Sequence, residues 1–205
     1  MGTGEAEGRN RLGPAAGLLL AAGAGTRLGR PKALVEIGGQ RLVDRGVHTL
    51  SNGGCAPVLV VLGAADTELP GGASTVRNPE WATGMGSSVR VGIDALPPDV
   101  DAVVIALADQ PLVTPGAVRR LLDAREQGAR AAVATYNGNQ RNPVMLGREY
   151  WSTVYGMAVN DVGARPFLRA YSHVVTPVAC DDIASPEDID TEEDLERLSG
   201  LLGGS

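Results

Sequence analysis

The chain has 205 residues, of which 43% are hydrophobic, and its formal net charge is -6. This length and apolar content are enough for one substantial core and favour one domain over two. No apolar run reaches the length of a membrane span, and a net negative charge argues against nucleic acid as a general partner. We therefore expect a cytoplasmic enzyme that binds neither a membrane nor nucleic acid.

The charge is unevenly distributed along the chain. Residues 181–196 hold nine acidic residues and no Lys or Arg, whereas the rest of the chain carries 18 basic and 15 acidic residues. A mildly basic body suits an anionic substrate, although arginines scattered over the surface would give the same excess. The two cysteines, Cys55 and Cys180, lie far apart and have no metal-ligand spacing, so we expect reduced structural thiols.

Residues 1–14 are predicted to form a flexible N-terminal tail, and residues 15–205 one domain. Two arginines followed by an apolar run also fit the start of a signal peptide. Glycine and proline interrupt that run, however, and cleavage near Ala24 would remove the first predicted strand.

Apolar strand candidates alternate with helix-like stretches, which indicates an α/β fold with a Rossmann-like, doubly wound, mostly parallel sheet. In such sheets ligands bind at the carboxyl ends of the strands. The predicted strands are residues 16–22, 57–63, 102–108, 129–135 and 174–178, and the predicted helices are residues 41–51, 87–96, 115–127, 148–154, 162–171 and 192–202.

The segment 17–32 is an apolar strand that opens into a loop rich in glycine and positive charge. Glycines allow the backbone to approach phosphate groups closely, and the threonine and the two cations supply donors and charge, so the loop predicts a nucleotide site. It is not a Walker loop, because Lys32 stands between Pro31 and Ala33, and Leu28 takes the third glycine place of a dinucleotide fingerprint. The residues concerned are Gly23, Gly25, Thr26, Arg27, Gly29 and Lys32.

A carboxylate follows the third predicted strand, in the sequence Asp109-Gln-Pro111. A carboxylate at the point where a buried strand reaches the surface is well placed to hold a divalent cation against phosphates. The alternative is that Asp109 only starts a turn. Near the C-terminus, Thr191 and Asp194 predict a capping box for the last helix, which leaves Asp190 unexplained.

The block from Asn78 to Arg90 places Gly84, Ser87 and Ser88 at the start of a predicted helix. Backbone amides and hydroxyls there suit the edges of a base and a ribose, although glycine and serine also cap helices routinely.

Taken in order, these blocks resemble the molybdenum cofactor cytidylyltransferases and guanylyltransferases over about residues 16–198. The resemblance implies a single domain of the nucleotide-diphospho-sugar transferase type. The glycine loop alone also suits the wider group of sugar nucleotidyltransferases.

The resemblance also implies a role for each matching residue. Asp109 and Asp190, but not Asp188, would hold Mg²⁺, and Lys32 and Arg27 would stabilise the leaving pyrophosphate, so Lys32, Arg27 and Asp109 are the candidate catalytic residues. The implied nucleotide-binding residues are Ala21, Ala22, Gly23, Gly25, Thr26, Arg27, Lys32, Gly84, Ser87, Ser88 and Asp109, and the implied acceptor-binding residues are Arg141, Asn142, Pro143, Asp161 and Arg165.

Two departures from the family pattern fall on the acceptor side. A residue is missing between Arg141 and Asn142, and Asn160 stands where glycine is usual. Arg141 and Arg165 are suited to clamp a phosphate, although surface ion pairs are the plainer explanation for both arginines.

The implied reaction transfers CMP from CTP to molybdopterin and releases pyrophosphate. In the related enzymes Leu-Ala-Ala-Gly, the sequence of Leu20 to Gly23 here, goes with cytidine, and the methyl group of Ala22 would fill space that a purine needs. A molybdoenzyme or its chaperone would be a partner. Two alternatives stay open: transfer from GTP or to a sugar or alcohol phosphate, and a redox or nucleotide-sensing protein on the same fold.

Overall fold

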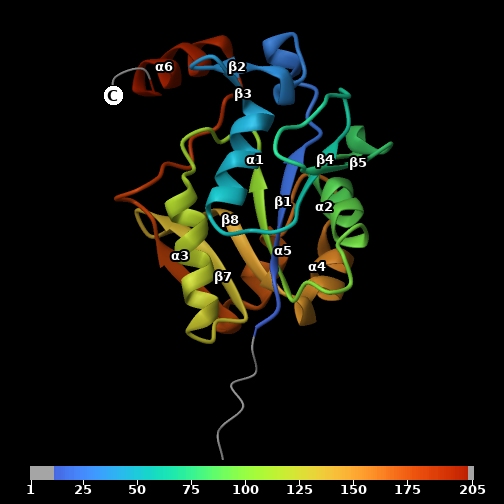
Figure 1. Ribbon diagram of the computed structural model, residues 1–205, viewed down its shortest axis with the longest axis vertical. Helices are drawn as coiled ribbons and strands as arrows, with labels where there is room; N and C mark the ends of the chain where they lie inside the picture. Colours follow the sequence, from blue (N-terminus) through green and yellow to red (C-terminus); the bar gives the residue numbers. More distant parts are fainter. Residues whose placement is uncertain (1–11, 203–205) are drawn as a thin grey trace, which may run out of the picture.

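The computed structural model describes residues 12–202, which form one seven-stranded sheet flanked by helices (Figure 1). The strand order is β5-β4-β1-β6-β8-β7-β9. The strands are β1 (Ala15–Ala21), β4 (Val58–Leu62), β5 (Ser74–Arg77), β6 (Ala102–Leu107), β7 (Ala131–Tyr136), β8 (Asn139–Gly147) and β9 (Val175–Ala179), and a separate two-stranded ladder pairs β2 (Glu36–Ile37) with β3 (Gln40–Arg41).

The central pairings are parallel, as the alternating pattern predicts. β1 pairs in parallel with β4 and β6, β4 with β5, and β7 with β9, whereas β8 runs antiparallel to both of its neighbours. All five predicted strands are present within one or two residues of their predicted ends. The mostly parallel α/β sheet is therefore confirmed.

The sequence pattern predicts neither β5 nor the β2–β3 ladder. It also misses strand β8. Pro143 lies inside it, and proline has no N–H for a ladder hydrogen bond. The strand is tolerated because the register of β7 and β8 shifts here: Val133 pairs with Val144 but Ala134 with Arg141, which leaves Asn142 and Pro143 outside the pairing.

Both faces of the sheet are buried, and β1 shows why its sequence is apolar throughout. Leu18 and Leu20 point into one core layer, while Leu19 and Ala21 point into the other. Because successive side chains of a strand alternate between faces, a strand covered on both sides reads as a continuous apolar run.

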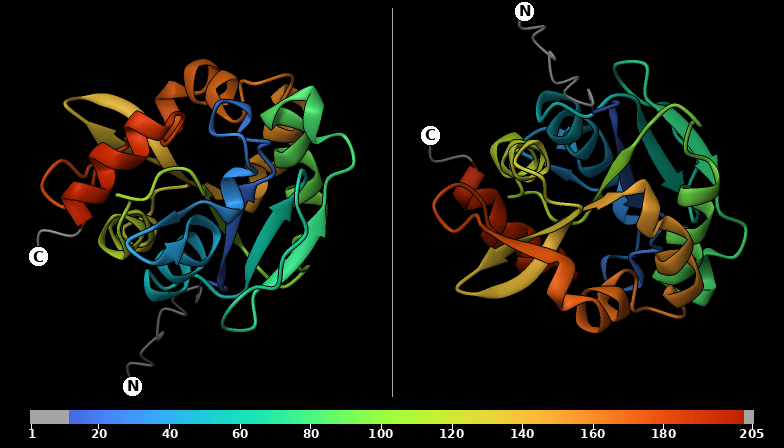
Figure 2. Two further views of the ribbon diagram at one scale, coloured as in Figure 1. Left: turned by 90° about the horizontal axis from the view of Figure 1, so that it is seen from above. Right: turned by 90° about the horizontal axis from the view of Figure 1, so that it is seen from below.

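The helices divide between these two layers. Helices α1 and α3 cover one face of the sheet, and α2, α4 and α5 cover the other (Figure 2). All of the predicted helices are found, although the fourth and fifth are shorter or shifted. Their bounds are α1 (Leu42–Asn52), α2 (Met85–Asp94), α3 (Pro115–Glu126), α4 (Trp151–Met157), α5 (Arg165–Ala170) and α6 (Glu192–Leu202).

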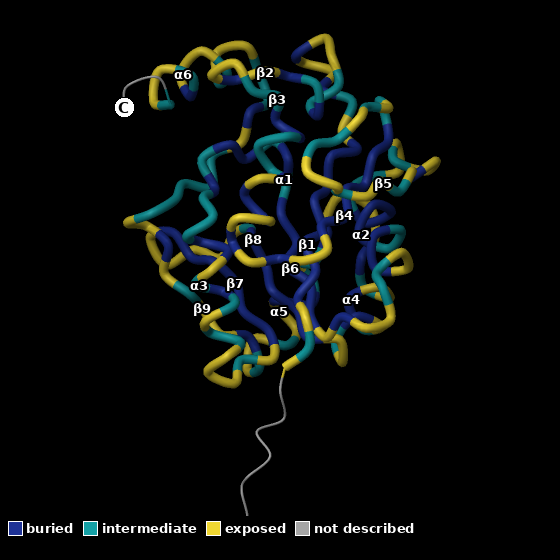
Figure 3. The backbone as a smooth tube through the Cα atoms, viewed as in Figure 1, coloured by how far each residue is buried: buried dark blue, intermediate teal, exposed yellow. Residues whose placement is uncertain are grey.

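The β2–β3 ladder and α6 lie side by side over the carboxyl-terminal end of β1 (Figure 1). The burial view shows mainly buried strands below and a largely exposed α6 above (Figure 3). We call the β2–β3 ladder and α6 together the cap. A separate small hydrophobic core stabilises the cap, and its buried residues are Leu28, Val35, Ile37, Leu42, Ile189 and Leu198. The cap brings the glycine loop and the acidic C-terminal segment to the same end of the sheet.

Most of the predicted tail, residues 1–11, lies outside the described residues. Within the described part, the Gly13 N–H donates to Asp101 (2.7 Å), and the Gly13 carbonyl accepts from Arg125 (3.0 Å). Both cysteines are buried and free. Across residues 12–202, no helix combines the length and the apolar character that crossing a membrane requires.

Candidate functional site

The loop after β1 folds back on itself and carries Lys32 to the end of the sheet. Gly25 has a φ of 60°, and a Cβ atom there would lie 2.1 Å from the Arg30 carbonyl oxygen, so only glycine fits. The Lys32 N–H then donates to the Gly23 carbonyl (3.2 Å). The turn therefore anchors the Lys32 backbone beside the end of β1.

The Lys32 ammonium group lies between two carboxylates that come from distant parts of the chain. Its Nζ donates to Asp109 Oδ2 (2.6 Å) and to Asp190 Oδ1. Arg27 lies farther out, 3.5 Å from Asp190 Oδ2. The structure thus places together the four charged residues that the sequence assigns to the phosphates and the metal.

Burial and charge act in opposite directions on this cluster. The Lys32 side chain is 18% exposed and that of Asp109 21%, whereas Asp190 is 44% exposed and Arg27 70%. Burial by itself lowers the pKa of Lys32, but the charges and hydrogen bonds of Asp109 and Asp190 outweigh it, so that the pKa lies above its ordinary value. Lys32 is therefore a fixed positive charge at neutral pH.

Asp190 reaches the cluster because the segment before α6 is hydrogen-bonded to the loop after β6. The Ile189 N–H donates to the Asp109 carbonyl (2.9 Å), and the Gln110 side-chain amide donates to Asp188 Oδ1 (2.7 Å). The predicted capping box is present, since the Asp194 carboxylate accepts from the Thr191 N–H (3.0 Å) and the Thr191 hydroxyl accepts from the Asp194 N–H (3.2 Å).

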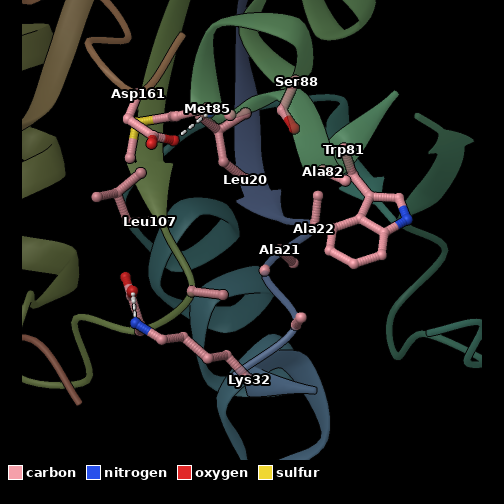
Figure 4. A pocket seen from close by; sticks show the side chains of 15 residues that line it. Leu20, Ala21, Ala22, Lys32, Trp81, Ala82, Met85, Ser88, Leu107 and Asp161 are labelled. Carbon is pink, nitrogen blue, oxygen red and sulfur yellow. Dashed lines mark hydrogen bonds and ion pairs between the residues drawn. The ribbon is translucent and has the colours of Figure 1, made fainter. Parts of the chain in front are cut away.

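A pocket of about 330 Å³ opens between the end of β1 and the start of α2 (Figure 4). Figure 4 shows Lys32 at one end of it and Trp81 beside Ala22 at another side. A Cβ atom on Gly63 would lie 2.5 Å from Trp81 Cβ, so this wall is tightly packed. The pocket is lined by Leu20, Ala21, Ala22, Gly23, Ala24, Lys32, Trp81, Ala82, Gly84, Met85, Ser88, Leu107, Ala108, Asp109 and Asp161.

The start of α2 is fixed by buried polar contacts. Asn78 is fully buried and donates to both Ser87 Oγ (2.8 Å) and Ser88 Oγ (3.0 Å). The Ser87 hydroxyl donates in turn to the Gly84 carbonyl (2.8 Å). Ser88 lines the pocket, while Ser87 is committed to the helix start and does not.

A second pocket of about 320 Å³ lies on the other side of Asp109. Strand β8 and helix α5 supply Arg141, Asn142 and Arg165 to its wall. Desolvation of the Asp188 carboxyl raises its pKa, and the nearby charge of Asp109 raises it further. The full lining is Met85, Leu107, Asp109, Gln110, Gln140, Arg141, Asn142, Val144, Val162, Ala164, Arg165, Leu168 and Asp188.

The two pockets share three residues, Met85, Leu107 and Asp109. Of the residues predicted for the acceptor, Arg141, Asn142 and Arg165 line the second pocket. Asp161, also predicted for the acceptor, lines the first pocket instead, where its Oδ1 accepts from the Met85 N–H (3.2 Å). The predicted residues that line neither pocket are Gly25, Thr26, Arg27, Ser87, Pro143 and Asp190.

The sequence does not single out several lining residues. Trp81 and Met85 stand inside the block from Asn78 to Arg90 and Gln110 directly follows Asp109, so proximity to a motif is the available signal. Leu107 gives no such signal, because it reads as an ordinary strand residue.

The carboxylate pair suits a hard divalent cation. Magnesium is usually held by one or two carboxylates together with substrate phosphates, and oxygen donors of this kind converge at Asp109 and Asp190. Within the described residues, no group of three or more His, Cys, Asp or Glu side chains is arranged to hold a metal ion. A cation at this site would therefore take its remaining ligands from phosphate oxygens or water.

Several known proteins are similar to this chain in sequence or in fold. Residues 17–174 match the family described as the MobA-like NTP transferase domain. The chain is 37% identical to nicotine blue oxidoreductase of Paenarthrobacter nicotinovorans, over 89% of this chain and 95% of that protein. It is 33% identical to 2-C-methyl-D-erythritol 4-phosphate cytidylyltransferase of Rhodococcus jostii strain RHA1, over 59% of this chain and 55% of that protein.

Among solved structures, the chain resembles the homologue of Mycobacterium tuberculosis Rv0371c from Mycobacterium sp. strain JC1. The TM-score is 0.78 at 28% identity, and the match covers 92% of this chain and 96% of the other.

Proposed function

This chain belongs to the family of MobA-like NTP transferase domains, and from that premise we propose that it transfers CMP from CTP to a molybdopterin-type acceptor and releases pyrophosphate. One observation carries the proposal: two pockets of similar size meet at Asp109. A transferase that joins two substrates directly needs such a pair of sites, with the reacting atoms at their junction.

The first pocket suits the nucleotide. Its Ala22 end holds the base, where Ser88 and Gly84 offer polar groups and Trp81 forms a wall. Its Lys32 end holds the triphosphate, because the loop amides and the ammonium group lie there.

The second pocket suits a phosphorylated acceptor. Arg141 and Arg165 supply charge-assisted donors to an anionic group, and Asn142 adds an amide. An oxygen of the acceptor phosphate forms a new bond to the α-phosphorus, and the bond from that phosphorus to the β-phosphate bridging oxygen breaks as pyrophosphate leaves.

Catalysis in this site is positioning and neutralisation of charge. Asp109 and Asp190 would hold Mg²⁺, which would neutralise phosphate charge when bound. Lys32 and Arg27 stabilise the charge that builds on the leaving pyrophosphate. The transfer is direct, without a covalent enzyme intermediate, because neither cysteine lines a pocket and no histidine lies in either lining to activate Ser88 as a nucleophile.

Thermal shift and product analysis test this function together. A ligand at about 100 times its dissociation constant adds roughly 2.7 kcal/mol of stability. We expect CTP with Mg²⁺ to raise the melting temperature more than GTP, ATP or UTP do, and pyrophosphate to appear only when a molybdopterin acceptor is present. If pyrophosphate is released with a sugar phosphate or an alcohol phosphate instead, the proposed acceptor is wrong, but the proposed class of reaction, nucleotidyl transfer, stands.

One comparison favours a second candidate, an oxidoreductase. The relative from Paenarthrobacter nicotinovorans carries that name and matches nearly the whole chain. In this case a reduced nicotinamide nucleotide would bind in the first pocket and pass a hydride to an organic acceptor in the second. Loss of reduced-nicotinamide absorbance with a dye acceptor, without pyrophosphate release from any triphosphate, would favour this candidate.

A further inference from the structure

We propose that Lys32 is a built-in counter-cation that holds the place of the divalent cation until a nucleoside triphosphate binds. Metal and nucleotide then enter the site together, and the free protein binds divalent cations poorly. The inference rests on the proposed metal site at Asp109 and Asp190. Its test distinguishes a failure of the proposed role of Lys32 from a failure of the proposed metal site.

The contacts show that the Lys32 ammonium group occupies the position between the two carboxylates. The Lys32 ammonium touches Asp109 Oδ2 at 2.6 Å and also Asp190 Oδ1, so one cation satisfies a carboxylate oxygen on each side. A magnesium ion on the same two oxygens would lie about 2.1 Å from each of them. It would then occupy the space of the ammonium group and repel its charge. Both cations cannot use this pair of oxygens at once.

The surroundings allow the side chain to leave while the backbone stays. The Lys32 N–H is held by the Gly23 carbonyl, which fixes the start of the side chain. A Cβ atom on Gly23 would lie 3.8 Å from Lys32 Cδ, so the glycine leaves room along the stem. Lys32 also lines the first pocket, where triphosphate oxygens would offer the ammonium new partners.

Two neighbouring arginines are placed less well than Lys32 to act as this counter-cation. Arg27 reaches Asp190 only at 3.5 Å with a side chain that is mostly exposed, so water screens its charge. Arg30 lies in the same loop but pairs with Glu192 at 3.2 Å, away from the carboxylate pair. Arg30 is therefore a matched control that removes one positive charge from the loop without vacating the cation position.

The test measures Mn²⁺ binding to the nucleotide-free protein by electron paramagnetic resonance. We expect Lys32→Met to bind Mn²⁺ at least about tenfold more tightly than wild type, because two carboxylates without a counter-charge attract a cation strongly. Arg30→Met should stay within about twofold of wild type by the same argument of screening. Thermal shift gives a second readout, since Mn²⁺ should raise the melting temperature of Lys32→Met more than that of wild type.

Each outcome decides the proposal. If Lys32→Met does not fold, Lys32→Gln takes its place, because it also removes the charge. The gain in affinity should vanish in the double variant Asp109→Asn/Lys32→Met, and a gain that persists there overturns the proposal. Equal Mn²⁺ affinity in wild type and Lys32→Met also overturns it. Because CTP itself binds Mn²⁺, binding with CTP present is measured as a change in the spectrum of the Mn²⁺–CTP complex when protein is added. If no variant changes that spectrum, the proposed metal site fails as well.

Discussion

The two pockets that meet at Asp109 are built in different ways. Small residues form much of the lining of the first, where a close approach of the Asn160 backbone at Gly84 leaves no room for a side chain, and the neighbouring turn at Gly25 is equally tight. The ends of long, exposed side chains shape much of the second, with Arg141 and Arg165 on its wall. The comparison suggests that one ligand is recognised by a rigid frame and the other by side chains that adjust.

The largest expected effect on the transfer rate is at Asp109, where the two pockets meet. We expect Asp109→Asn to slow transfer by about a hundredfold or more, because an amide keeps the shape of the carboxylate but loses the charge that holds the cation. Circular dichroism and the melting temperature should show that the fold is kept.

Asp188→Asn is the matched control, since Asp188 lines only the second pocket. It should alter acceptor KM and leave nucleotide affinity unchanged. Transfer at an ordinary rate by Asp109→Asn at ordinary Mg²⁺ concentrations would remove Asp109 from the mechanism.

The rigid frame is tested by two glycines of the same loop with similar φ angles. A Cβ atom on Gly29, at 63°, meets nothing within 4 Å, whereas one on Gly25, at 60°, meets the Arg30 carbonyl. We expect Gly29→Ala to cost about 1 to 2 kcal/mol of unfolding free energy from backbone strain alone. Gly25→Ala should cost about 3 kcal/mol or more, because the clash adds to the strain.

Urea unfolding measures both costs, and nucleotide affinity should fall only in the Gly25 variant. Equal costs for the two variants would show that the loop relaxes around the clash and that the frame is not rigid.

The two arginines of the second pocket test whether its side chains recognise the acceptor. Loss of a charge-assisted hydrogen bond costs about 1.5 to 3 kcal/mol, so Arg141→Ala and Arg165→Ala should each raise acceptor KM by about tenfold or more. The dissociation constant of the nucleotide, measured by calorimetry, should not change. Arg169→Ala is the control, because Arg169 lies on the same helix as Arg165 but outside the pocket. A weaker nucleotide affinity in either pocket variant would mean that the two pockets are not separate in function.

The smallest expected effect concerns the base. Ala22 lines the first pocket, with Trp81 beside it (Figure 4). Removing its methyl group in Ala22→Gly should shift the ratio of kcat/KM for CTP over GTP toward GTP by about 1 to 3 kcal/mol, the usual worth of one methyl group in a pocket. Steady-state rates with both nucleotides and one acceptor measure this ratio. A wild-type preference for GTP would contradict the cytidylyl assignment but not the transferase class.

Much of the fold could be predicted from local sequence because its signals are local. A strand buried on both faces must be apolar throughout, as in β1, and a capping box needs only residues three positions apart, as in Thr191 and Asp194. Strand β8 was not predicted because Pro143 argues against a strand. The structure accommodates it in an irregularity of β8 itself, where Asn142 and Pro143 lie outside the pairing with β7.

The amino-acid sequence by itself therefore determined five strands of the sheet, the glycine turn and the residue types at the ends of the strands. The tertiary structure decided which of those residues meet. Lys32 touches a carboxylate 77 positions away and another 158 positions away, and Asp161 lines the first pocket rather than the second. The physical reason is that torsion preferences and burial patterns depend on residues close together in the sequence. The distances between Lys32 and the two carboxylates depend instead on how the cap packs over the sheet.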